Sequence, residues 1–164
     1  MLWNIEMKLI QFGTKGTGIH MYPVCVSWYD IDTREGKHYI VEPVEFWDSS
    51  DDDDYPPSTV DAEEKGIHVS CLSNALNKDF GNETVYTENP IKTWDCINRI
   101  YQACGDNPTF SIENIHEVIP QVNYDLYVRI CNLLCQRIDC SDSYGALFVL
   151  SGAVSVLRKP IDIN

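Results

Sequence analysis

The sequence predicts an α/β protein with a mixed sheet whose faces are covered by helices. In the first half of the 164-residue chain, short apolar runs are bounded by turn residues, as strands are. In the second half, apolar residues recur at spacings of three and four, as they do in amphipathic helices. An N-terminal hairpin followed by alternating helix and strand is typical of a mixed sheet between helices. The length suits one domain, and we expect a single domain over residues 1–164.

The first half contains three predicted strands. The first is the run Lys8–Phe12, which we expect to end in a glycine-rich turn at 13–18. Residues 21–29 are rich in Tyr, Val, Cys and Trp and predict a buried strand. Residues 37–43 follow a polar turn and predict the partner strand, so that 19–43 forms a hairpin.

An acidic segment separates the two halves of the chain. Residues 48–59 contain four consecutive aspartates at 51–54 and the pair Pro56-Pro57. Adjacent carboxylates repel one another and proline lacks a backbone donor, so this segment is predicted to be an exposed loop.

The second half contains the predicted helices. A helix precedes a short strand at 83–87, and Ile91, Trp94, Ile97, Tyr101 and Cys104 define an apolar face on a helix over 91–104. Ser111 is predicted to cap a short helix that runs through Ile119. A longer helix follows at 123–138, and the last helix begins after Cys140-Ser141-Asp142 and ends at Arg158. Its apolar run at 146–157 is too short to cross a bilayer and predicts a core helix.

Charge and cysteine content restrict the class of partner and the compartment. The formal net charge is −13, which repels phosphate backbones and anionic membranes. A basic protein surface, or nucleic acid reached through a divalent metal, is therefore the expected partner. The seven cysteines are an odd number and most lie in apolar stretches, as buried free thiols do. Residues 1–12 lack the pattern of a signal peptide, so we expect a reducing compartment, cytoplasm or nucleus.

The order of elements and one set of residues resemble the ribonuclease H-like fold of the proofreading-type DEDD 3′–5′ exonucleases, over residues 8–157. The run from Ile10 to Gly16 occupies the place of that family's first motif, and its apolar frame, Thr14 and Gly16 match. Gly66-Ile67 resembles the short segment after the third strand. Asn89 and the pair Trp94-Asp95 resemble the second motif, an Asn followed by an aromatic-Asp pair.

The resemblance breaks down at the catalytic acids. The family carries an Asp and a Glu two residues apart on the first strand, and Gln11 and Gly13 stand in their place here. In the last helix, Ser141-Asp142-Ser143 offers one acid where a third motif is expected, without the preceding His or Tyr at the right offset. Two-metal hydrolysis needs carboxylates from separate elements, so these departures imply that hydrolysis is lost.

The cofactor prediction follows from the same residues. We expect no cofactor and no resident metal, with Mg²⁺ or Mn²⁺ only if the chain is an active nuclease. Cys131 and Cys135 lie one helical turn apart and Cys140 follows, but no His accompanies them, so buried core thiols are predicted rather than zinc ligands.

Three functions remain open at this point. The first is a non-catalytic exonuclease-like domain that binds a protein or a nucleic acid. The second is a divergent metal-dependent 3′–5′ exonuclease that uses Glu6, Asp95 and Asp142, with Asn4-Ile5-Glu6 as an alternative first motif. The third is an acidic inhibitor or viral accessory protein that covers a basic site of its partner.

Overall fold

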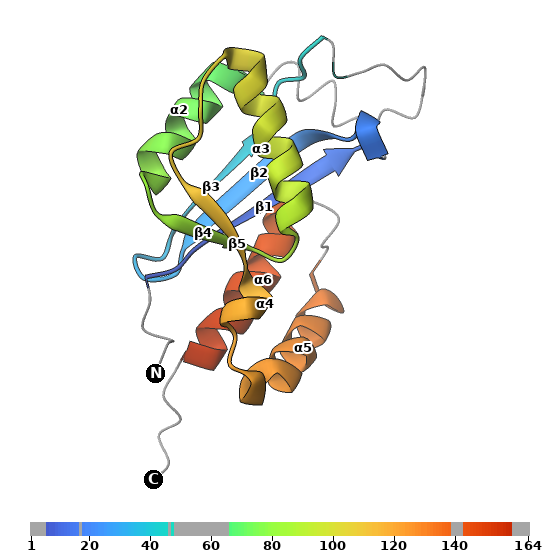
Figure 1. Ribbon diagram of the computed structural model, residues 1–164. Helices are drawn as coiled ribbons and strands as arrows, with labels where there is room; N and C mark the ends of the chain where they lie inside the picture. Colours follow the sequence, from blue (N-terminus) through green and yellow to red (C-terminus); the bar gives the residue numbers. More distant parts are fainter. Residues whose placement is uncertain (1–5, 17, 46, 48–65, 139–142, 159–164) are drawn as a thin grey trace.

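The computed structural model describes residues 6–16, 18–45, 47, 66–138 and 143–158 (Figure 1). The predicted acidic loop at 48–59 lies outside these ranges. The strands are β1 (Lys8–Lys15), β2 (Tyr22–Asp30), β3 (Glu35–Ile40), β4 (Thr84–Thr87) and β5 (Ser111–Asn114). The helices are the 3-10 turn η2 (Gly18–His20), α2 (Val69–Phe80), α3 (Pro90–Cys104), α4 (Ile115–Val118), α5 (Gln121–Cys135) and α6 (Ser143–Arg158).

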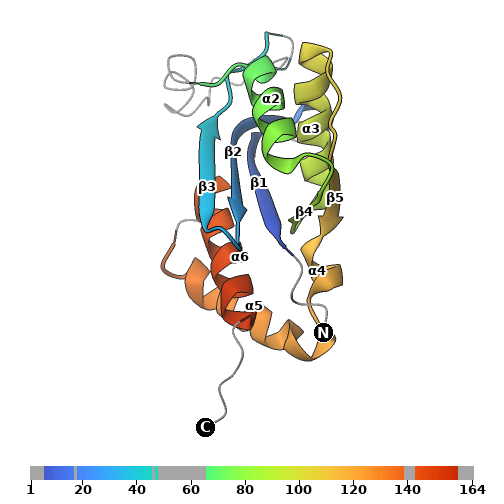
Figure 2. The same ribbon diagram turned by 90° about the vertical axis from the view of Figure 1, so that its left-hand side faces the viewer.

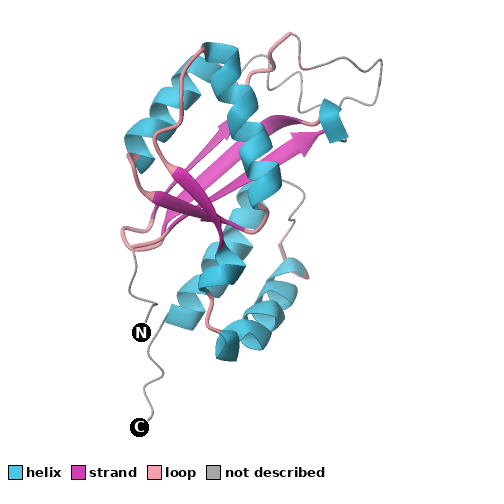
Figure 3. Cartoon of the chain, in the orientation of Figure 1, coloured by secondary structure: helices cyan, strands magenta, loops and turns pink. Residues whose placement is uncertain are grey.

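The five described strands form one mixed sheet in the order β3-β2-β1-β4-β5 (Figure 3). The pairs β3–β2 and β2–β1 are antiparallel, whereas β1–β4 and β4–β5 are parallel. The predicted fold class, an α/β protein with a mixed sheet and an N-terminal hairpin, is confirmed. The strand β1 is central, so both of its faces must be covered.

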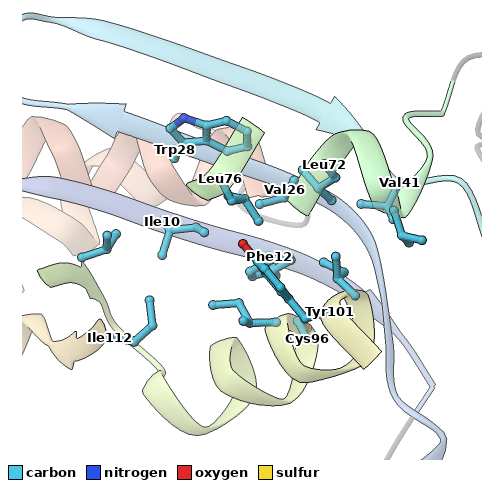
Figure 4. Close-up of a cluster of buried hydrophobic side chains, with 14 of the residues drawn as sticks. Ile10, Phe12, Val26, Trp28, Val41, Leu72, Leu76, Cys96, Tyr101 and Ile112 are labelled. Atoms are coloured by element: carbon cyan, nitrogen blue, oxygen red, sulfur yellow. The ribbon is translucent and has the colours of Figure 1, made fainter. Parts of the chain in front are cut away.

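One face of the sheet is covered by α2 and α3. On β1, Ile10 and Phe12 point to this side, where they join Leu72 and Leu76 of α2 and Tyr101 of α3 (Figure 4). All five side chains are almost completely buried. Burying such side chains contributes roughly 1.5–3 kcal/mol each, so this cluster is the principal source of stability on this face.

The opposite face is covered by α6, with α4 and α5 beside it (Figure 2). Leu9 of β1 points to this side and packs in a second cluster with Leu150 and Val154 of α6. Tyr127 of α5 belongs to the same cluster, and its hydroxyl donates a hydrogen bond to the Glu88 carboxylate. Burial and the Glu88 carboxylate both raise the pKa of Tyr127. Tyr127 thus anchors α5, which otherwise lies along α6.

The structure corrects the predicted end of the first strand. Gly13, Thr14 and Lys15 belong to β1 and pair with β2, where the register shifts between Gly13 and Thr14. Glycine at 13 permits a close contact inside the strand rather than a turn. The turn begins at Gly16, whose φ of +82° is a conformation that favours glycine.

Two predictions about the second half also need correction. Residues 111–114 form the edge strand β5 instead of the start of a helix, and Asn114, not Ser111, caps the short helix α4. Ile91 lies in the first turn of α3 and is exposed, although the spacing pattern placed it on the buried face. Within the described ranges, no helix is long and apolar enough to span a membrane.

Asp79, at the end of α2, ties that helix to the sheet. Its carboxylate accepts hydrogen bonds from Trp28 Nε1 and Lys37 Nζ, both at 2.8 Å, and its carbonyl oxygen accepts one from Lys8 Nζ at 2.7 Å. Burial raises the pKa of the Asp79 carboxyl, but the bonds from Lys37 and Trp28 outweigh burial and hold it below its usual value. One carboxylate therefore joins α2 to β2 and β3.

We predict that Asp79→Asn lowers the free energy of unfolding at pH 7 by about 1 kcal/mol, because the Lys37 ion pair is lost at a partly exposed site. Since the pKa of Asp79 is depressed in the folded state, its contribution is present above the unfolded value of about 3.9 and disappears as the pH falls through the folded value. Urea unfolding at pH 7 and pH 3 measures this, with Asp95→Asn as an exposed control. If Asp79→Asn lowers the free energy of unfolding equally at both pH values, the pKa of Asp79 is not depressed in the folded state.

Candidate functional site

The candidate site lies on the face of the sheet that α6 covers, where β1, β2 and β3 run side by side. Strand pairing places Gln11 opposite Ser27 and Ser27 opposite His38, in one row across the three strands. The next row contains Gly13, opposite Cys25. Gln11 and Gly13 are the two positions at which the sequence resemblance requires carboxylates.

The start of α6 comes close to the central strand at Gly13. A Cβ atom at this position would lie 2.4 Å from Cys25 Sγ and 3.5 Å from the backbone nitrogen of Ser143, the first residue of α6. Real Cβ atoms do not approach a sulfur this closely, so any side chain here displaces its neighbours. The space that a carboxylate would need is filled by the Cys25 thiol and the start of α6.

A chain of polar side chains connects α6 to the edge of the sheet beside Gly13. The Ser27 hydroxyl lies 2.9 Å from the Ser143 hydroxyl and 2.5 Å from Nδ1 of His38. Both serines are buried, and His38 is exposed at its far side. Each buried hydroxyl thus has a partner, which offsets the cost of removing it from water. Through these two buried serines the network joins the start of α6 to β2 and β3.

Of the predicted catalytic acids, the structure describes Glu6 and Asp95, and neither is among the residues that border Gly13. Glu6 is exposed and precedes β1, so the alternative first motif lies ahead of the strand. Asp95 is exposed on α3 and borders an open hollow with Ile19, Met21 and Arg99. The nearest side chains and backbone to Gly13 come instead from β2 and α6. Asp142 lies outside the described residues.

The described ranges contain no group of three or more His, Cys, Asp or Glu side chains that is able to hold a metal ion. The six cysteines in these ranges carry free thiols, as expected. Burial raises the pKa of the Cys131 thiol to about 11, which disfavours the thiolate that a metal requires. Cys135, predicted to be a buried core thiol, is exposed, and Cys140 lies outside the described residues.

A hollow of about 460 Å³ lies between β3 and α6, beside the polar chain. Its lining includes Tyr29, Lys37, His38, Tyr144, Leu147 and Phe148. Tyr144 is 57% exposed and Phe148 53% exposed, and the ring of Tyr144 meets the ring of His38 edge-on at 5.6 Å. Exposed aromatic rings around a concave surface are typical of binding sites.

Sequence reasoning missed this hollow, because it treated the last helix as a core helix throughout. Tyr144 and Phe148 are four residues apart and therefore lie on the same side of α6, which is the one signal that the sequence contains. Their exposure depends on how α6 is rotated against the sheet, and the Ser27–Ser143 contact fixes that rotation.

The lysine that lines the hollow is already paired within the protein, and so are two cations outside the hollow. Lys37 Nζ lies 2.8 Å from an Asp79 oxygen and Lys8 Nζ lies 2.7 Å from a Glu83 oxygen. On the α3 side, Arg99 donates a hydrogen bond to the carbonyl oxygen of Ile19. A surface that binds nucleic acid needs cations free to contact phosphates, so these pairs disfavour that ligand.

We predict that Gly13→Ala lowers the free energy of unfolding by about 1–3 kcal/mol, because the new methyl group overpacks against Cys25 and α6. In the Gly13→Ala/Cys25→Ala double variant, removal of the sulfur makes room for the methyl group, and most of the loss is recovered. Urea unfolding of the two single variants and the double variant measures this coupling. Strictly additive effects would show that Cys25 does not occupy the space beside residue 13.

No family model matches the chain, and a search of the curated proteins finds no match.

Proposed function

We propose that this chain is a non-catalytic, ribonuclease H-like domain of the exonuclease type that binds a protein partner. The proposal rests on one observation about β1. Gly13 stands where the resemblance requires the second carboxylate, and the thiol of Cys25 fills the space beside it. The strand order β3-β2-β1-β4-β5, with an antiparallel hairpin and two parallel strands, is the topology that such a domain would have.

A protein is a better ligand than a nucleic acid for this surface. Tyr144, Phe148 and the ring of His38 offer aromatic contact area, which protein interfaces favour. Lys37, the cation in the lining, is paired with Asp79, so it is poorly placed to hold a phosphate. We therefore assign the hollow between β3 and α6 as the site that receives the partner.

The chemistry of the partner follows from the charge of the whole chain. The net charge is −13, and residues 48–65 alone contribute eight acidic side chains against one lysine. Such a field accelerates the approach of cationic surfaces and repels anionic ones. The partner that fits is a protein segment with basic residues flanking an apolar side chain, which enters the aromatic hollow.

The test uses a random peptide library displayed on phage, selected on the purified protein. We expect the selected peptides to be basic and apolar and to bind at least tenfold more weakly to Tyr144→Ala/Phe148→Ala, because interface aromatics often contribute 2 kcal/mol or more. Val156→Ala, an exposed apolar position of the same helix, is the matched control and retains full affinity.

Fluorescence anisotropy measures the affinity of the selected peptides, and single-stranded DNA and RNA oligonucleotides serve as the second probe in the same assay. We expect no binding at physiological salt. Tight oligonucleotide binding, or selected peptides that do not distinguish the double variant from the control, would contradict the proposed function.

A further inference from the structure

The helix α5 presents large apolar side chains on the side that faces away from the rest of the protein. Val122 is 87% exposed, Leu126 47% and Leu133 62%, and their spacing places them in one stripe along the helix. The opposite side of α5 is the one that packs, through Tyr127 and partly buried Cys131. Figure 1 shows α5 beside α6 at the periphery of the molecule.

This pattern is unusual for a surface helix. A helix on a protein surface normally has one apolar side and one charged side, and a helix that is apolar on both sides is normally covered on both. Apolar side chains in a contiguous exposed stripe mark an interaction surface. We call the stripe formed by Val122, Leu126, Arg129 and Leu133 the outer face of α5.

The charge on α5 differs from the charge of the chain as a whole. Residues 121–138 contain one acid, Asp125, and two bases, Arg129 and Arg137, in a protein with a net charge of −13. A second copy of the chain is repelled by most of the surface because of this charge. At α5, where the local charge is slightly positive, that repulsion is weaker than over the acidic parts of the chain.

The outer face is also complementary to itself. When two α5 helices lie antiparallel about a two-fold axis between residues 127 and 128, Val122 of one copy faces Leu133 of the other. In the same arrangement Arg129 of each copy comes beside Asp125 of the other, so both of these contacts join charges of opposite sign. A two-fold contact requires this kind of self-complementary pattern, in which the same patch serves both partners.

We propose that two copies of this chain associate through the outer face of α5, in an antiparallel two-fold contact that pairs Asp125 with Arg129 across the interface. One helix from each copy buries a small area, so the dimer is weak and depends on protein concentration. The hollow between β3 and α6 lies outside this contact, and the proposal holds whether or not the chain binds a partner there.

The first test is sedimentation velocity of the purified full chain over a wide range of concentration. We expect the average mass to rise from monomer toward dimer. Leu133→Glu should remain a monomer, because the contact would bury two carboxylates, one from each copy. Ile91→Glu, an exposed apolar position on α3, is the matched control and dimerises like the natural protein. A natural chain that is monomeric at every concentration would overturn the proposal.

A charge exchange tests the pairing itself. Arg129→Asp places like charges across the axis and weakens the dimer, as does Asp125→Arg. The double variant Asp125→Arg/Arg129→Asp restores opposite charges and recovers association. All these positions are exposed on α5, so urea unfolding should show that each variant remains folded. If the single variants associate as strongly as the natural protein, α5 does not pair in this way. The same conclusion follows if the double variant associates no more strongly than the single variants.

Discussion

The close approach of α6 to the central strand at Gly13 is the constraint on which the rest of this structure depends. The first turn of α6 fits here because residue 13 has no side chain, and Cys25 Sγ and Ser143 N fill the space beside it. Once that turn is seated, the Ser143 hydroxyl meets Ser27, and Ser27 meets His38. These contacts fix how α6 is rotated, and the rotation determines that Tyr144 and Phe148 face outward beside β3. The glycine at position 13 thus seats the helix that carries the proposed binding surface.

The interior and the periphery of the molecule have different physical roles. The sheet is rigid because clusters of buried side chains cover it on both faces, and Asp79 joins the end of α2 to two strands. The helix α5 is held less extensively, through Tyr127 and its contacts with α6. Exposed apolar side chains are concentrated on α5 and α6. We expect the binding surfaces on these two helices, because the side chains of the sheet beneath them are already buried or paired.

Much of the fold could be predicted from local patterns, and most of the site could not. Enrichment in Tyr, Val, Cys and Trp identified β2, which is buried on both faces, and spacings of three and four identified α3 and α5, which each have one buried face. The strand β5 was missed because only Ile112 of its four residues is buried, which leaves no alternation to detect. The contact between Ser27 and Ser143 joins residues 116 positions apart, so no local pattern contains it. The sequence shows an amide and a glycine, with no acid, at Gln11 and Gly13, but it does not show the thiol that fills the space beside Gly13.

The most direct measurement of the central claim is a nuclease assay on the purified protein. End-labelled single-stranded DNA and RNA are incubated with the protein in the presence of Mg²⁺ or Mn²⁺, alongside Asp95→Ala. The account predicts no release of nucleotides by either protein, because Gln11 and Gly13 supply no carboxylate to the β1 face. Metal-dependent release that Asp95→Ala abolishes would contradict the account and establish a working exonuclease whose ligands lie elsewhere in the chain.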